Sequence, residues 1–251
     1  MVEMVINELP VGSRVRFGRY AIANRDPVEI DWIKVSKQNH FISEKALLGM
    51  KFDEFEMNYD YNSNYSESNI RQFMNSDGFP WFHPTTSNDR PVEHITFDSY
   101  ITVDMRKYRG LLYYFTDHEL SLIEKQDGDY LRLPTVWEIN GGFPYFRRYG
   151  KRARPMDQYG CLERSHYEPG MYCAYYVDDH KNDGYVTEFD RSGSFNRMVP
   201  SHYSGVRPVC RLYELSEVIE TGKNTYKMNL SSSEPVKFFK ETQSIDWLLG
   251  I

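Results

Sequence analysis

The sequence predicts a mixed α+β protein built from antiparallel sheets, with two or three short helices and long loops. The clearest observation is the stretch 172–212, where short aromatic and β-branched runs alternate with turns rich in Asp, Asn, Gly and Ser. Such alternation is typical of an antiparallel meander. Aromatic residues make up 16% of the chain, with 20 Tyr and 15 Phe, which favours pleated sheet over a helical bundle.

Strand signals also open the chain. Apolar and polar residues alternate over 8–18 and again over 28–35, and a third strand-like run covers 40–43. Trp32 falls on the apolar face of the second run. We therefore expect two or three antiparallel strands at the start of the domain, with Trp32 as a structural residue.

A first helix is expected over 64–75, because Ser66 or Ser68 can cap it and the apolar residues that follow share one face. Residues 76–104 come next and are rich in Pro, Asp, Asn and Ser. A loop this long inside a compact domain is usually functional or an insertion. We expect the aromatic run 79–82 within it to anchor the loop on the core, with an exposed ligand platform as the alternative.

Two further helix starts carry capping signals. Thr116 and Glu119 form the Thr-x-x-Glu pattern of a capping box, in which each side chain bonds the other residue's backbone N–H. A short strand at 130–133 is followed by a turn and then by a third helix that begins at Thr135. Trp137, in the first turn of that helix, is expected to be structural.

The net charge of −6 argues against a nucleic-acid-binding protein, because such proteins usually carry a basic surplus. A basic run at 147–154 is interpreted as a solvated face, with binding of phosphate or an acidic sugar as the alternative. The first ten residues lack the basic and apolar regions of a secretory leader, and no apolar window is long enough for a membrane span. We therefore expect synthesis in the cytoplasm and no membrane partner.

Three cysteines, Cys161, Cys173 and Cys210, form neither a CxxC nor a CxxH pair, so zinc binding is not expected. Three reduced thiols fit a protein made in the cytosol, and one disulfide stays open as the alternative. Signatures of serine hydrolases, P-loop proteins and dinucleotide-binding proteins are absent from the sequence.

The turn 178–184 raises the question of calcium. Asp178, Asp179 and Asp183 supply the hard oxygen ligands that calcium prefers. Lys181, however, occupies a ligand position of the calcium loop that this spacing would otherwise suggest. We favour a solvated hairpin turn with Gly184 at a positive φ, and therefore no cofactor, with calcium as the alternative.

Several phrases, in this order, resemble an uncharacterised bacterial and phage domain family with a C-type-lectin-like architecture. They occupy residues 11–20, 30–35, 41–52, 68–75, 115–120 and 205–212. The resemblance implies one C-type-lectin-like domain over residues 1–212, with a loop insertion at about 76–104 and a C-terminal extension at 213–251. That extension could dock on its own domain, or it could be an assembly tail that contacts another copy or a virion neighbour.

Residues 131–138 also resemble the RLPTEAEWE phrase of the formylglycine-generating enzyme group, which shares this broad fold. Those oxidases hold copper with a pair of cysteines near the terminal strand, and only Cys210 lies there. Because a site built from thiolates would lack its ligands, we do not expect an enzyme.

The resemblance therefore implies non-enzymatic recognition of a glycan or a protein through loops that a rigid sheet displays, as in a phage virion or bacterial surface component. The alternatives are an intracellular interaction protein, such as a phage-encoded inhibitor of a host system, and a divergent enzyme. Arg207 is expected to be structural, with its guanidinium bridging carbonyls or a carboxylate. The candidate ligand-binding residues are Tyr175, Tyr176, Asp178, Asp179, Asp183, Arg191, Ser194, His202 and Tyr203.

Overall fold

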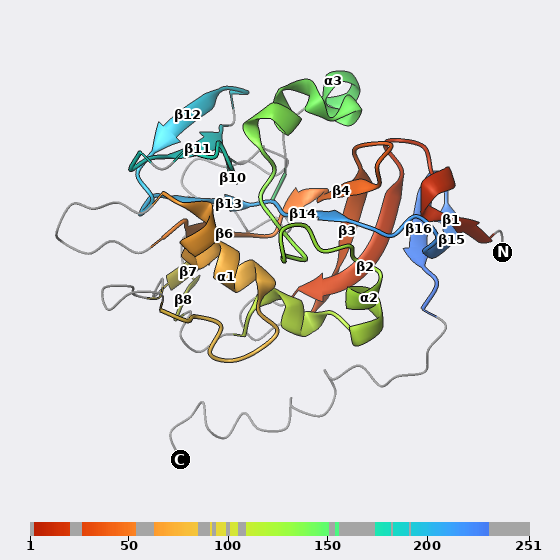
Figure 1. Ribbon diagram of the computed structural model, residues 1–251, viewed down its shortest axis with the longest axis horizontal. Coiled ribbons are helices and arrows are strands. Elements are labelled where there is room, and N and C mark those ends of the chain that lie inside the picture. The colour runs from red at the N-terminus through yellow and green to blue at the C-terminus, as the bar shows by residue number, and fades with distance from the viewer. Residues whose placement is uncertain are drawn as a thin grey trace, which may run out of the picture.

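Two seven-stranded sheets lie next to each other in the described part of the chain, with short helices around them (Figure 1). The structure is a computed structural model. It describes residues 3–20, 27–53, 63–84, 91, 94–98, 101–104, 109–150, 154–155, 174–181, 183–190 and 192–230. The predicted α+β class is confirmed. None of the helices in these ranges is both long and apolar enough to cross a membrane.

The first sheet gathers strands from both ends of the described chain. Its order is β1 (Glu3–Val5), β15 (Glu217–Gly222), β16 (Thr225–Met228), β2 (Arg14–Tyr20), β3 (Val28–Lys34), β4 (His40–Ser43) and β14 (Val209–Arg211). The strands predicted near 8–18, 28–35 and 40–43 are β2, β3 and β4. Because β15 and β16 belong to this sheet, the expected domain boundary after Leu212 is corrected: the domain continues through at least Met228. Residues 231–251 lie outside the described residues.

The second sheet contains the predicted meander. Its order is β12 (Phe195–Met198), β11 (Val186–Phe189), β10 (Tyr175–Val177), β13 (Tyr203–Val206), β6 (Leu48–Lys51), β7 (His94–Asp98) and β8 (Ile101–Asp104). Strands β10, β11 and β12 pair antiparallel as predicted. However, β13 pairs parallel to β10 and antiparallel to β6, so the meander does not simply continue. Since β7 and β8 form a hairpin, the interval 76–104 is not one unstructured loop.

The two sheets are joined where two stretches of chain cross side by side between them. One stretch runs from β4 through the short strand β5 (Lys45–Ala46) into β6, and the other runs from β13 into β14. Strand β5 also pairs with β9 (Arg154–Pro155). Backbone hydrogen bonds hold the crossing: Ser43 N–H donates to the Pro208 carbonyl at 3.0 Å, and Leu47 N–H donates to the Val206 carbonyl at 2.8 Å.

Arg207 lies at this crossing and is only 2% exposed. Its Nε donates to the Ser43 carbonyl at 3.0 Å, and a terminal nitrogen lies 3.5 Å from the Glu44 carbonyl. Its guanidinium carbon also lies 5.1 Å from the centre of the Tyr175 ring. The guanidinium therefore bridges carbonyls of the opposite strand, which is the structural role that the sequence suggested.

Trp32 is fully buried in the larger of two hydrophobic clusters. Its Nε1 donates to the Phe17 carbonyl at 3.0 Å, and its ring stacks on the Phe17 ring with centroids 5.1 Å apart. In the loop after the first helix, Trp81 is also buried whereas Phe79 is exposed. The run 79–82 thus contributes the expected anchor through Trp81.

The helices are short, and α1 and α2 begin at predicted caps. Ser68, rather than Ser66, caps the first α-helix and accepts from Arg71 N–H at 3.3 Å. Thr116 and Glu119 form the predicted capping box, with hydrogen bonds of 3.1 and 2.8 Å. The helical segments are η1 (Ile6–Glu8), η2 (Tyr65–Glu67), α1 (Asn69–Asn75), η4 (Leu111–Tyr114), α2 (Asp117–Ser121), η5 (Glu138–Gly142) and α3 (Pro144–Tyr149).

Replacing Arg207 with methionine should destabilise the fold by roughly 3 kcal/mol, because hydrogen bonds from a charged donor contribute about 1.5–3 kcal/mol each and the carbonyls would stay buried. Urea unfolding followed by circular dichroism measures this change. The control is Arg211→Met on the neighbouring strand, whose partly exposed side chain pairs with Glu124 and should cost at most ~1 kcal/mol. Equal stability of the two variants would show that the crossing does not depend on Arg207.

Candidate functional site

A cavity of about 490 Å³ lies between the start of η5 and the loop that follows β10. We call it the Trp137 cavity. Asp178 and Asp179, two of the candidate ligand-binding residues, are in its wall. The described lining residues between 135 and 147 are not among the predicted ligand-binding residues. The described residues that line the cavity are Thr135, Val136, Trp137, Asn140, Gly141, Gly142, Arg147, Asp178, Asp179 and His180.

The wall that carries Trp137 is fixed to the core through a capping box and an ion pair. Thr135 Oγ1 accepts from Glu138 N–H at 3.2 Å, and a Glu138 carboxylate oxygen accepts from Thr135 N–H at 2.8 Å. The same carboxylate receives two hydrogen bonds from Arg132, at 2.8 and 2.5 Å. The backbone of Arg132 in turn pairs with Val209 of β14. This wall is therefore rigid before any ligand arrives.

The second wall is attached directly to the first. Val136 N–H donates to the Asp178 carbonyl at 3.0 Å, and Asp178 N–H donates to the Pro134 carbonyl at 2.9 Å. These two bonds form a parallel bridge between Thr135 and Asp178. The loop after β10 consequently cannot move away from the Trp137 turn without breaking backbone hydrogen bonds.

Trp137 is 71% exposed, so the structural role expected for it is wrong. Its indole lies against Gly142, where an added Cβ would overlap the six-membered part of the ring. Gly141 before it has φ 113°, a conformation that favours glycine. Arg147 Nε donates to the Gly141 carbonyl at 2.6 Å and so holds the turn closed. The backbone supports one side of the indole, and most of the remaining ring surface faces solvent.

Asp178 and His180 form a hydrogen-bonded pair in the opposite wall. Asp178 Oδ1 accepts from His180 N–H at 2.8 Å, and Asp178 Oδ2 lies 2.9 Å from His180 Nδ1. The Asp178 side chain is 14% exposed and the His180 side chain 73% exposed. Burial raises the pKa of Asp178, and the hydrogen bond from His180 opposes that effect. His180 has φ 56°, a left-handed conformation that is uncommon for a residue with a side chain.

Asp179 and Asp183 point to separate partners. Asp179 accepts from Lys181 N–H at 3.1 Å and from Thr187 Oγ1 at 2.6 Å, whereas Asp183 forms an ion pair with Arg197. The turn has Gly184 at φ 82°, as the hairpin interpretation predicts. In the part of the chain that the structure describes, no group of three or more His, Cys, Asp or Glu side chains is placed to hold a metal ion.

Tyr175 and Tyr176 are fully buried, so the ligand-binding role expected for them is wrong. They belong to a strand in the interior of the second sheet, and each packs into a different hydrophobic cluster. The Tyr176 hydroxyl donates to the His202 carbonyl. Alternation along the strand buries both side chains because both faces of this sheet are covered at β10.

The remaining candidate residues that the structure describes do not line the Trp137 cavity. Ser194 lies in an exposed turn, where its N–H donates to Asp190 at 2.9 Å. His202 is half-buried, with its Nε2 3.8 Å from Glu188. Tyr203 is also half-buried, and its ring lies 5.7 Å from the Lys51 ammonium.

Arg191 lies outside the described residues, as do Cys161 and Cys173. Cys210 is buried, which raises the pKa of its thiol.

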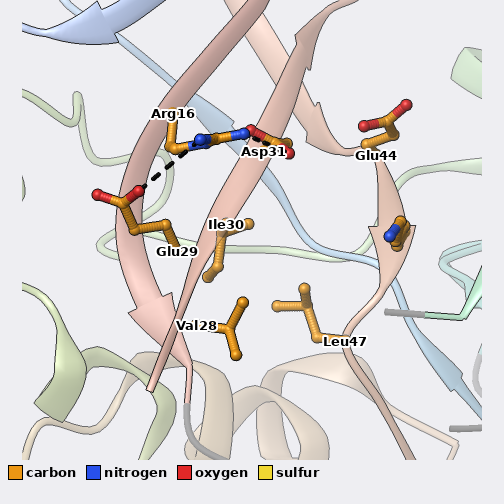
Figure 2. Close-up of a pocket in the computed structure, with 8 residues that line it drawn as sticks. Arg16, Val28, Glu29, Ile30, Asp31, Glu44 and Leu47 are labelled. Carbon is orange, nitrogen blue, oxygen red and sulfur yellow. Dashed lines mark hydrogen bonds and ion pairs between the residues drawn. The ribbon is translucent and has the colours of Figure 1, made fainter. Parts of the chain in front are cut away.

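A second cavity of about 260 Å³ lies between β3 and the β4–β6 segment (Figure 2). Figure 2 shows Arg16 reaching from β2 towards Glu29 and Asp31. Arg16 makes two hydrogen bonds to Asp31, at 2.7 and 3.2 Å, and lies 3.9 Å from Glu29. Because Arg16 already pairs with both carboxylates and no aromatic ring is among the described residues that line this cavity, it is the weaker candidate.

His40 lies close to the Arg132–Glu138 pair that supports the Trp137 wall. Its Nδ1 lies 2.9 Å from Ser36 Oγ, and its ring centre lies 5.2 Å from that of Phe143. Burial, assisted by the charge of Arg132, lowers the pKa of His40 to about 4. In the folded protein this imidazole is therefore neutral at pH values where an unfolded chain would protonate it.

The free energy of unfolding should consequently fall as the pH drops from about 6.5 to about 4, because the unfolded chain binds the extra proton first. Above pH 6.5 this contribution is fully present. Urea denaturation at pH 7.5, 5.5 and 4.5 measures the loss, and His40→Gln should make it smaller. The exposed His83→Gln is the control and should retain the wild-type dependence. If His40→Gln also retains it, His40 is not the group responsible.

Comparisons of the chain with family models, with curated proteins and with solved structures gave no match. The functional interpretation therefore rests on the geometry of the Trp137 cavity.

Proposed function

We propose that this protein is a non-enzymatic recognition protein that binds a glycan or a protein ligand in the Trp137 cavity. The observation that carries the proposal is the exposed indole of Trp137, supported from behind by Gly142. A large aromatic ring that is left open to water beside a polar cavity is a typical binding anchor, since Trp is enriched among the residues that dominate binding energy.

The rigidity of the site supports the same proposal. The Thr135–Glu138 capping box and the Arg132 ion pair fix one wall, and backbone hydrogen bonds at Asp178 fix the other. A ligand that enters such a cavity orders few side chains, so little of its binding energy is lost to ordering. Compared with the sequence-based expectation, the proposed surface keeps Asp178 and Asp179 and replaces the buried tyrosines with Trp137.

We extend the proposal to the fold family and the biological setting. The six phrases that carry the resemblance coincide with β2, β3, the segment from β4 to β6, α1, α2 and the crossing from β13 to β14. This agreement between phrases and ordered elements supports a C-type-lectin-like domain. Display of a ligand site by such a domain suits a phage virion or bacterial surface component.

Trp137→Ala should weaken binding of the ligand at least ~tenfold, because it removes the central anchor of the site. The measurement uses fluorescently labelled protein on a glycan array and on a peptide array, with bound members then titrated in solution. Tyr213→Ala, which removes another exposed aromatic ring that does not line the cavity, is the matched control and should bind like the wild type. A ligand affinity that Trp137→Ala leaves unchanged would contradict the proposal.

A further inference from the structure

We propose that the ligand of the Trp137 cavity is an uncharged pyranose residue of a glycan, held with its C–H face on the indole and its hydroxyls on the opposite wall. This inference rests on the proposed recognition function and specifies its ligand. It follows from three properties of the cavity: an open aromatic face, a rim of hydrogen-bond acceptors, and the sign of the charge.

The first property is the geometry of the indole. Gly142 occupies one side of the Trp137 ring, so a ligand can use only the side that faces solvent. A flat apolar surface of limited area binds most favourably to a partner that is apolar on one face and polar at its edges. A pyranose ring fits this requirement, because its axial C–H bonds form an apolar face and its hydroxyls lie around the rim.

The second property is the capacity for hydrogen bonding. An ionised carboxylate offers about four acceptor positions. In Asp178 two of them are directed to His180, and in Asp179 two are used by Lys181 N–H and Thr187 Oγ1. Both carboxylates therefore retain acceptor capacity for sugar hydroxyls. Because His180 Nδ1–H donates to the Asp178 carboxylate, the exposed neutral imidazole presents Nε2 to the ligand as a hydrogen-bond acceptor.

The third property is the charge. Among the described lining residues, Asp178 and Asp179 contribute two carboxylates and Arg147 contributes the only cationic side chain of fixed charge. Arg147 Nε is already directed to the Gly141 carbonyl. The resulting negative balance, in a chain of net charge −6, repels an acidic sugar. The acidic-sugar interpretation of the basic run at 147–154 is thereby disfavoured, although Arg147 itself lines the cavity.

A cationic ligand fits less well than a neutral one. Ammonium groups are held by cation–π attraction, and their sites typically surround the cation with several aromatic rings. Trp137 is the only aromatic residue in the described lining, and the Arg147 guanidinium would oppose a second cation. The cavity volume of about 490 Å³ falls within the range of roughly 300–1,000 Å³ that small-ligand sites occupy.

The test titrates the full chain with free glycans while following ligand saturation-transfer NMR and tryptophan fluorescence. The neutral probes are glucose, galactose, mannose, N-acetylglucosamine and their β-linked disaccharides. The charged probes are glucuronic acid, N-acetylneuraminic acid, glucosamine and a trimethyllysine peptide. We expect at least one neutral probe to bind with an affinity that changes little between 50 and 500 mM NaCl, and the acidic probes to bind at least tenfold more weakly.

Variants separate the parts of the proposal. Trp137→Ala should abolish detectable binding, whereas Trp137→Phe should weaken it several-fold because an aromatic platform remains. Gly142→Ala keeps the indole but displaces it, and should weaken binding at least tenfold while thermal unfolding shows that the fold persists. Asp178→Ala should weaken binding at least tenfold through lost hydroxyl contacts. Tyr213→Ala, outside the cavity, should bind like the wild type.

Four outcomes overturn the inference, and they are distinguishable. Preferred binding of an acidic or cationic probe removes the neutral-glycan assignment. Trp137-dependent binding of peptides alone, from the array described above, leaves the recognition function in place but removes the glycan. Neutral-glycan binding that survives Trp137→Ala, or the failure of every glycan and peptide probe to bind, removes both the ligand assignment and the proposed site.

Discussion

The fold depends on a buried cation at the point where its two sheets meet. Arg207 stands between β13 of one sheet and β14 of the other, and its guanidinium bonds to carbonyls of the paired chain at Ser43 and Glu44. A charged group this deeply buried is stable only where its donors are satisfied. The two crossing stretches must therefore keep one relative position, which fixes how the sheets are arranged.

A short chain of contacts connects the candidate site to this crossing and holds it in place. Strand β14 begins two residues after Arg207, and its first residue, Val209, pairs with the backbone of Arg132. The Arg132 side chain then holds Glu138, which closes the capping box at the start of the Trp137 turn. The protein thus presents an exposed aromatic ring on a turn that is linked to its core by backbone pairing, an ion pair and a cap.

Local patterns in the sequence predicted local structure well. The caps at Ser68 and Thr116 depend only on residues that are close in the chain, and they are present as expected. The alternation in β3 holds only from Ile30 to Trp32, because Val28 is exposed and the end of the strand is buried on both faces. Exposure depends instead on strand order. Tyr175 and Tyr176 carry the composition of a recognition loop, but β13 pairs beside their strand and makes it an interior strand, whose two faces are covered by the two hydrophobic clusters. No local pattern reports a parallel pairing between strands separated by a meander.

The same limit explains why the sequence predicts a structural role for Trp137. An apolar residue in a first helical turn normally faces inward, and here the indole instead leans on Gly142. The sequence did contain a signal, since the pair Gly141-Gly142 soon after a tryptophan marks a turn in which the backbone can approach a ring closely. The exposure of Trp137 is predictable only if the two glycines are interpreted as a place where the indole can lie, and not merely as the end of a helix.

The backbone around the Trp137 cavity argues that its shape is functional. Gly141 adopts φ 113°, Gly142 excludes a side chain so that the indole can lie flat, and His180 adopts φ 56°. Glycine costs up to about 1 kcal/mol of conformational entropy relative to alanine, and a left-handed histidine adds about 1–3 kcal/mol of strain. A turn that only had to connect two elements could avoid these costs. All three residues line one cavity, which is explained if the fold must hold Trp137 and His180 in these positions.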